Sequence, residues 1–309
     1  MKDKKVIFMG TPEFSVPVLE MLIKETNVIM VVTQPDSYVG RHHTLTYSPV
    51  KQVALDNNIE VYQPEKIRNE YEYILDKKPD IIITCAYGQI IPSVLLDTPK
   101  YKAINVHASL LPKLRGGSPL HRAIIDGYDK TGVTIMYMAP GMDDGDIITQ
   151  EEIKINDTDN VGIIHDKLSV LGRDLLLKTL PSIFDGTNTR TKQDESEVTF
   201  AYNIKREEEK IDFNKTAREV YNQIRGLYPF PTAYLELNGE VIKVCSSRLG
   251  ETKKGSCGEI TSIYKDGIGI MCSDREIILT RIKPSGKKEM DVKDYLNGKK
   301  DNLLGEKIC

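Results

Sequence analysis

Residues 103–122 read A-I-N-V-H-A-S-L-L-P-K-L-R-G-G-S-P-L-H-R, and the rest of the chain is best interpreted outward from them. The stretch begins as a short apolar strand, in which alternation places Asn105 and His107 on one face. It then passes through a glycine-rich turn to Ser118 and Pro119, a good N-cap and first-turn pair for a helix. Open α/β sheets hold their chemistry at the carboxyl ends of strands, beside such loops. The pattern favours a functional site here over the alternative, an edge strand whose polar face is merely solvated.

On both sides of this stretch, short apolar strands alternate with helical patterns, which predicts an α/β domain with a mostly parallel sheet. The expected strands and helices cover 5–9, 27–33, 59–62, 65–77 (helix), 79–86, 104–107, 120–125 (helix), 133–138, 147–155 and 160–184 (helix). The first turn lacks the G-x-G-x-x-G pattern, so a dinucleotide-binding fingerprint is not supported.

The connection over residues 33–51 is long for a loop between a strand and a helix, and such long loops are often functional. It is basic, with Arg41, His42, His43 and Lys51. Adjacent histidines without an acidic or cysteine companion are usually solvated, which favours a surface pair over a metal site. We therefore expect no metal here.

The predicted strand over 133–138 leads into A-P-G-M-D-D-G-D-I-I, residues 139–148. Its carboxylates could suggest calcium, but the twelve-residue loop pattern with its terminal Glu is missing. An aspartate close to a histidine at the edge of a sheet suits acid–base chemistry better. Asp143 is the candidate, whereas a solvated acidic turn accounts for Asp144.

From residue 233 onward the pattern changes to short β-type segments separated by Gly, Asn and Lys turns. These segments cover 233–237, 240–247, 258–264, 267–272 and 276–283, after a helix at 214–226 and before a short helix within 291–305. Closely spaced short strands predict a small antiparallel barrel. We expect a catalytic domain over 1–188, a linker over 189–206 and a barrel domain over 207–309.

The composition is that of an ordinary globular protein of 309 residues with a net charge of −3, so no global basic field indicates nucleic acid. Five cysteines without metal-ligand spacing argue against zinc and against a disulfide framework, and they favour a reducing compartment. The chain has no apolar run of about 18 residues. We therefore expect a cytoplasmic protein with no membrane association. A monomer is a separate expectation, which these observations do not test.

Several motifs together resemble those of the folate-dependent formyltransferases. I-N-V-H-A-S-L-L-P-K-L-R-G-G-S-P-L-H-R resembles the core motif of that family, and G-V-T-I-M-Y-M-A-P-G-M-D-D-G-D-I resembles its second block. The opening I-F-M-G-T-P-E-F, the basic loop and R-G-L-Y-P-F-P-T-A at 225–233 extend the similarity over nearly the whole chain. These additional motifs look like those of the family members that formylate an aminoacyl-tRNA.

The resemblance implies a Rossmann-like N-terminal domain and a C-terminal barrel resembling an OB-fold. It implies transfer of a formyl group from 10-formyltetrahydrofolate to the amino group of methionine on initiator methionyl-tRNA, for translation initiation. The catalytic asparagine, histidine and aspartate of the family match Asn105, His107 and Asp143.

The resemblance also implies ligand contacts. The residues that match folate-binding positions are Ser109, Leu110, Leu111 and Pro112, together with Gln89, Ile90 and Ile91 in the pteridine pocket. Arg41 matches a position that presents an arginine to the tRNA acceptor end, and Lys51 is a further candidate contact. Two alternatives stay open: the same chemistry on a sugar amine or glycinamide ribonucleotide, and a non-enzymatic nucleic-acid-binding protein built on the barrel.

Overall fold

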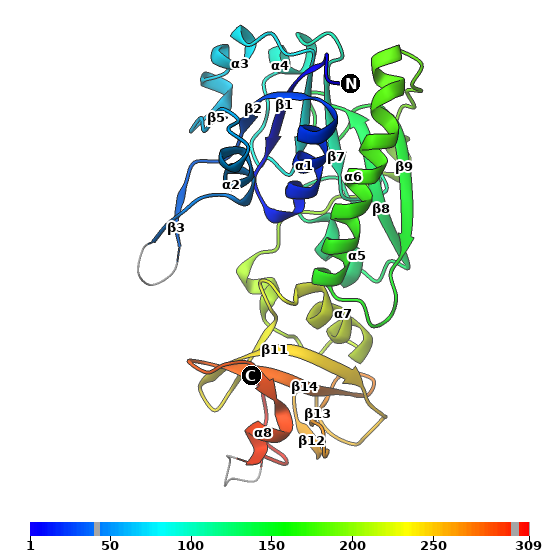
Figure 1. Cartoon of the computed structure of the whole chain (residues 1–309). Coiled ribbons are helices and arrows are strands. Elements are labelled where there is room, and N and C mark those ends of the chain that lie inside the picture. Colours follow the sequence, from blue (N-terminus) through cyan, green and yellow to red (C-terminus); the bar gives the residue numbers. More distant parts are fainter. Residues whose placement is uncertain (40–43, 298–302, 309) are drawn as a thin grey trace. The chain divides into compact units, whose positions relative to one another are not determined.

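The computed structural model describes residues 1–39, 44–297 and 303–308, which form two compact units (Figure 1). The first unit comprises Met1–Pro119, Thr131–Ile153 and His165–Tyr202. The second comprises Leu120–Lys130, Lys154–Ile164 and Asn203–Cys309. Each unit is therefore assembled from separated stretches of the chain.

A seven-stranded sheet forms the centre of the first unit, in the order β5-β2-β1-β6-β7-β8-β9. Its strands are β1 (Lys5–Gly10), β2 (Asn27–Val32), β5 (Val61–Tyr62), β6 (Ile81–Cys85), β7 (Ala103–His107), β8 (Lys130–Tyr137) and β9 (Ile147–Lys154). The pairs from β5 to β7 are parallel, whereas β7 and β8 are antiparallel. The predicted Rossmann-like, mostly parallel sheet is confirmed.

The central strands are buried because they consist of continuous apolar runs, which suit strands that are covered on both faces. Helix α6 (Val161–Asp185) lies in front of β7 and β8 in Figure 1. Helix α6 and strand β7 approach closely at Gly172, where an added Cβ would lie 3.0 Å from a methyl carbon of Val106. The remaining helices that precede α6 are α1 (Val16–Glu25), α2 (Pro49–Asp56), α3 (Glu72–Asp76), α4 (Ser93–Asp97) and α5 (Pro119–Ile125).

The predicted helix over 65–77 is wrong. The structure has a 3₁₀ turn at Ile67–Asn69 followed by the short helix α3. The Ile67 N–H donates to the side-chain oxygen of Gln89 at 2.9 Å, and the Lys66 N–H donates to the Glu70 carboxylate at 2.8 Å. These N–H groups belong to the first predicted turn, where they would have no helical partner. The helix is interrupted because the backbone is non-helical at Lys66 (φ −136°) and again at Glu70 (φ −135°).

The long connection over 33–51 contains two short antiparallel strands, β3 (Ser37–Val39) and β4 (Thr44–Thr46), which the sequence pattern did not indicate. They extend away from the sheet of their own unit in Figure 1. Strands of three residues are too short to show a recognisable alternation, which is why this part was expected to be irregular.

The second unit is built on an antiparallel sheet in the order β10-β11-β14-β13-β12, with β15 paired to β14. Its elements are α7 (Ala217–Leu227), β10 (Tyr234–Leu237), β11 (Glu240–Leu249), β12 (Ile260–Ile263), β13 (Ile268–Met271), β14 (Glu276–Pro284), β15 (Met290–Asp291) and α8 (Val292–Asn297). Irregular register between β11 and β14 near Ser246 bends the pair, as β-bulges do. The predicted antiparallel C-terminal fold is confirmed as a curled half-barrel sheet.

The helix predicted within 291–305 is present over Val292–Asn297, and residues 298–302 lie outside the described part of the chain. Helix α7 begins at the capping box formed by Thr216 and Glu219, and its buried face joins the core of the curled sheet. In the ranges that the structure describes, no helix combines the length and the apolar character needed to cross a membrane.

Candidate active site

Asn105 is the central residue of β7, and its side-chain amide is held by the neighbouring strand β6. The register of β6 and β7 pairs Asn105 with Thr84, whose side chain is buried. The Thr84 hydroxyl donates to Asn105 Oδ1 at 2.8 Å. Among the described residues, the Asn105 NH₂ group has no hydrogen-bond acceptor. The arrangement leaves this group available to donate to a ligand atom.

His107 lies two residues further along β7, on the same face as Asn105, and its ring is buried. Nε2 lies 3.1 Å from the carbonyl oxygen of Leu114. Since a carbonyl oxygen only accepts, Nε2 carries the proton of this bond. Nδ1 lies 3.6 Å from Asp143 Oδ2. With Nε2 protonated, a proton on Nδ1 makes the ring an imidazolium that pairs with the carboxylate.

Asp143 lies in the loop after β8 and has a φ of +49°, in the left-handed region that residues other than glycine rarely adopt. Its Oδ2 accepts a hydrogen bond from the Gly116 N–H at 2.8 Å. The nearby Asp144 is exposed, and Asp146 pairs with Arg190. Of the carboxylates in this loop, Asp143 is the one that faces His107.

The structure therefore brings together the three side chains that were predicted to be catalytic. An amide and an imidazole share one face of a strand end, and a carboxylate reaches the imidazole from a separate loop. Their catalytic roles stay a prediction.

The segment predicted to contact folate at 109–112 follows directly after β7. Ser109 and Leu111 are buried, whereas Leu110 and Pro112 are half-buried. The Ser109 hydroxyl donates to the backbone carbonyl four residues later at 2.7 Å, and the Leu111 N–H donates to the Thr134 hydroxyl at 3.2 Å. These polar groups stabilise the turn itself. Leu110 and Pro112 are the members of the segment that keep exposed surface for a ligand.

The second predicted folate segment, Gln89 to Ile91, divides in the same way. The side-chain oxygen of Gln89 accepts a hydrogen bond from the Ile67 N–H, and the side-chain nitrogen of Gln89 donates to Gln34 Oε1 at 3.2 Å. Ile90 is 85% exposed, whereas Ile91 is buried. The Gln89 amide is thus used within the protein, and Ile90 is the member open to a ligand.

Of the two predicted tRNA contacts, Lys51 belongs to the described part of the chain. Arg41 lies outside the described residues. The Lys51 ammonium pairs with Asp36 at 2.5 Å and with Gln63 Oε1 at 2.8 Å, and it lies 4.0 Å from the ring centre of Tyr47. The hydrogen bond from Lys51, and then that from Gln63, lower the pKa of the Asp36 carboxyl. Lys51 therefore anchors the base of the loop in this structure.

Sequence reasoning missed three residues that shape the site. Thr84 orients Asn105, Leu114 supplies the carbonyl that binds His107, and Gly116 supplies the N–H that binds Asp143. Thr84 had a usable signal, because it is a polar residue inside the apolar run I-I-I-T-C. The contributions of Leu114 and Gly116 are made by backbone atoms, which no residue pattern reveals.

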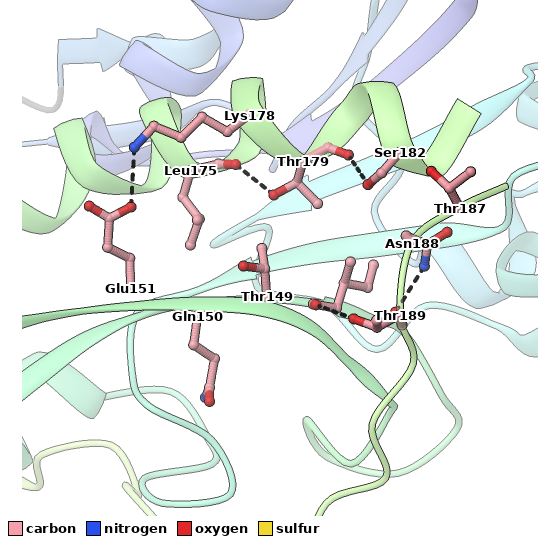
Figure 2. A pocket seen from close by; sticks show the side chains of 11 residues that line it. Thr149, Gln150, Glu151, Leu175, Lys178, Thr179, Ser182, Thr187, Asn188 and Thr189 are labelled. Atoms are coloured by element: carbon pink, nitrogen blue, oxygen red, sulfur yellow. Dashed lines mark hydrogen bonds and ion pairs between the residues drawn. The ribbon is translucent and has the colours of Figure 1, made fainter. Parts of the chain in front are cut away.

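A hollow in the first unit lies between β9 and the C-terminal half of α6 (Figure 2). It has a volume of about 460 Å³, and the predicted catalytic residues do not line it. The Lys178 ammonium pairs with Glu151 across it at 3.4 Å. The hydroxyls of Thr179 and Ser182 donate to carbonyls of their own helix. Its polar groups thus largely bind one another.

The cysteines of the described part of the chain are free thiols, and Cys85 and Cys272 are buried. Burial raises the pKa of each of these two thiols to about 12, so neither is a reactive thiolate near neutral pH. Across residues 1–39, 44–297 and 303–308, the structure has no group of three or more His, Cys, Asp or Glu side chains that could hold a metal ion. His42 and His43 lie outside these ranges.

Comparison with known proteins identifies relatives over the whole chain. Residues 4–180 match the family model of the formyl transferases, and residues 203–300 match that of the formyl transferase C-terminal domain. A methionyl-tRNA formyltransferase from Staphylococcus epidermidis is 53% identical over 305 residues, which cover 98% of each chain. One from Staphylococcus aureus is 51% identical over 308 residues, covering 98% of this chain and 99% of the relative.

Among solved structures, an N-formyltransferase from Helicobacter canadensis in complex with folinic acid and dTDP-3-aminofucose has a TM-score of 0.67 at 24% identity, covering 90% of this chain and 98% of that chain. A sugar 3N-formyl transferase in the presence of dTDP and 5-N-formyl-THF also has a TM-score of 0.67, at 21% identity, covering 92% of this chain and 99% of that chain. At these identities the likeness shows a shared fold. Because both parts of the sequence match, and because relatives at 51–53% identity span its length, this chain belongs to the formyl transferase family.

Proposed function

We propose that this chain transfers the formyl group of 10-formyltetrahydrofolate to the free amino group of methionine on initiator methionyl-tRNA. One observation carries the choice of acceptor: relatives named for this activity match the chain over 98% of its length, C-terminal unit included. The structural neighbours that hold folinic acid or formyl-THF support a reduced folate as the donor.

Asn105 is proposed to stabilise the oxygen of the formyl group as it becomes negative. The amine attacks the formyl carbon, and the tetrahedral centre that forms carries an oxyanion until the bond from that carbon to N10 of the folate breaks. The NH₂ group of Asn105 lacks an acceptor among the described residues, and the Thr84 hydroxyl fixes the orientation of the amide. Such a preorganised donor suits a charge that appears only during the reaction.

His107 and Asp143 are proposed to handle the proton. The attacking nitrogen must lose one proton, and N10 of the folate must gain one as it leaves. Both ring nitrogens of His107 are directed at protein atoms, one at the Leu114 carbonyl and the other at Asp143. We therefore assign the oxyanion to Asn105, and propose that the Asp143 carboxylate, held against His107, takes up the proton lost by the attacking nitrogen and returns one to N10 as it leaves.

The acceptor end of a tRNA is single-stranded, so backbone charge and base stacking supply much of its binding. Arg41 is proposed to contact it, with Lys51 supporting the base of the same loop through Asp36. We place the activity in the cytoplasm, where charged tRNA is used. We assign one chain to each functional unit, because the proposed catalytic residues all come from one chain.

The test is an acceptor comparison with 10-formyltetrahydrofolate as the donor. Purified protein is mixed in parallel with charged initiator tRNA, charged elongator methionyl-tRNA, a nucleotide-linked amino sugar and glycinamide ribonucleotide. We expect formylation of the initiator methionyl-tRNA at the highest kcat/KM. Faster formylation of the sugar or of the ribonucleotide would assign the chain to that alternative, and folate binding without transfer to any acceptor would refute the proposal.

A further inference from the structure

The side-chain amide of Gln193 bridges two carbonyls of the loop that carries Asp143. Its Nε2 donates to the carbonyl oxygen of Asp143 at 2.7 Å and to that of Gly145 at 2.8 Å. One amide nitrogen has two protons, so both bonds can form together. Gln193 lies in the segment after α6, which the sequence suggested was only a linker. Here this segment holds the backbone on both sides of Asp144.

The orientation of the Gln193 amide is itself determined by Arg115. The Arg115 Nε donates to Gln193 Oε1 at 3.0 Å, and the guanidinium also pairs with Glu195 at 2.9 Å. The Arg115 side chain is only 5% exposed, so its charge requires these partners. Because Arg115 can only donate, it binds the oxygen of the amide and directs the nitrogen toward the loop.

The segment that contains Arg115 also contacts the Asp143 loop directly. Gly116 follows Arg115 and donates its N–H to the Asp143 carboxylate at 2.8 Å. The backbone of Arg115 is fixed by hydrogen bonds to Thr199 and Ala201, at 2.9 and 2.7 Å. Gly116 therefore holds the carboxylate of Asp143, and Gln193, which Arg115 orients, holds the Asp143 carbonyl.

Asp143 needs support of this kind, because its φ of +49° persists only where the surroundings determine it. We propose that Gln193, oriented by Arg115, is a positioning residue that holds Asp143 in register with His107 during formyl transfer. The inference rests on the proposed function for its kinetic test, but its structural consequence can be measured without any substrate.

Two substitutions separate positioning from packing. Gln193→Met keeps the length of the side chain and removes both N–H donors together with the acceptor for Arg115. Gln193→Glu keeps that acceptor but places a carboxylate oxygen against the two carbonyl oxygens. For both variants we expect kcat to fall about 10- to 100-fold, since small displacements of catalytic groups have effects of this size. The KM values for methionyl-tRNA and for the folate should stay within about twofold, because the hydrogen bonds of the Gln193 amide within the described residues all go to the Asp143 loop and to Arg115.

A double-mutant cycle with Asp143 makes the test specific. If Gln193 acts through Asp143, Gln193→Met should cost less than about twofold in an Asp143→Asn background. The pH profile of kcat should also change shape in Gln193→Met, since the pair that handles the proton is displaced. Hydrogen exchange of the amides at 142–146 should be faster in Gln193→Met than in the wild type, with or without ligands.

Thr189→Val is the matched control, because Thr189 lies in the same segment and its hydroxyl donates to the Ile148 carbonyl at 3.2 Å, in the wall of the hollow shown in Figure 2. It should leave kcat and exchange at 142–146 unchanged, and thermal unfolding confirms that each variant is folded. A loss in Thr189→Val equal to that in Gln193→Met would overturn the inference, as would Gln193 variants with wild-type kcat and exchange. A wild-type protein that formylates no methionyl-tRNA would instead refute the proposed function.

Discussion

Replacing Thr84 with valine tests whether the orientation of the Asn105 amide matters for catalysis. Thr84 is 3% exposed, and its hydroxyl donates to Asn105 Oδ1 at 2.8 Å. Valine retains the branched shape of threonine but cannot donate. The substitution therefore leaves the amide in place and removes the bond that distinguishes its oxygen from its nitrogen.

The expected effect follows from the strength of that one bond. A hydrogen bond of this kind contributes about 0.5–1.5 kcal/mol net, which corresponds to a fall of about 2- to 12-fold in the productive population and hence in kcat. Asn105→Ala removes the donor itself and should cost about 10²–10³-fold. Thr84→Val should therefore lie between the wild type and Asn105→Ala, with the KM for methionyl-tRNA unchanged.

The assay is the initial rate of formylmethionyl-tRNA formation at saturating folate. Thr26→Val is the matched control, because Thr26 is also buried and its hydroxyl binds a carbonyl of α1 at 2.7 Å. In the double variant Thr84→Val with Asn105→Ala, the loss of kcat should equal that of Asn105→Ala alone, since no amide is left to orient. Two outcomes would refute the reasoning: wild-type kcat in Thr84→Val, or full multiplication of the two losses in the double variant.

Three further predictions follow from the same structure. Asp143→Asn should lower kcat about 10²–10⁴-fold by removing the carboxylate that faces His107, and near-normal turnover of the purified variant would exclude Asp143 from the mechanism. Burial raises the pKa of the Glu276 carboxyl, but hydrogen bonds from three hydroxyl groups lower it by more, so the pKa in the folded protein is lowered. The ionised carboxylate therefore stabilises the fold above about pH 4, and this contribution is lost as the pH falls through the folded pKa. In urea titrations, Glu276→Gln should therefore lower the free energy of unfolding by about 1–3 kcal/mol at pH 7 and by less at pH 3.5, and an equal loss at both pH values would contradict this. Arg41→Ala should raise the KM for methionyl-tRNA and leave folate binding unchanged in a direct titration; weaker folate binding would show that the loop has been assigned to the wrong ligand.

Features that depend on local periodicity could be predicted from the residues alone. Alternation along one strand places Asn105 and His107 on the same face, and a continuous apolar pattern predicts the long helix that is observed as α6. The change of pattern after residue 233 predicts the antiparallel fold of the C-terminal part. These predictions succeed because each depends on residues within one or two elements, where side-chain direction follows from the backbone geometry alone.

The way in which the candidate site is held depends on contacts between distant segments of the chain. Thr84 reaches Asn105 across 21 positions of the sequence, and Gln193 reaches Asp143 across 50. Such contacts depend on the order of the strands and on the paths of the loops, which local patterns do not encode. The local pattern over 65–77 likewise missed that Gln89, 22 positions away, binds the Ile67 N–H and that the backbone leaves helical geometry at Glu70. The residue types thus indicated the kind of chemistry. The geometry of the candidate site, in contrast, depends on hydrogen bonds that form only when distant segments of the chain pack together.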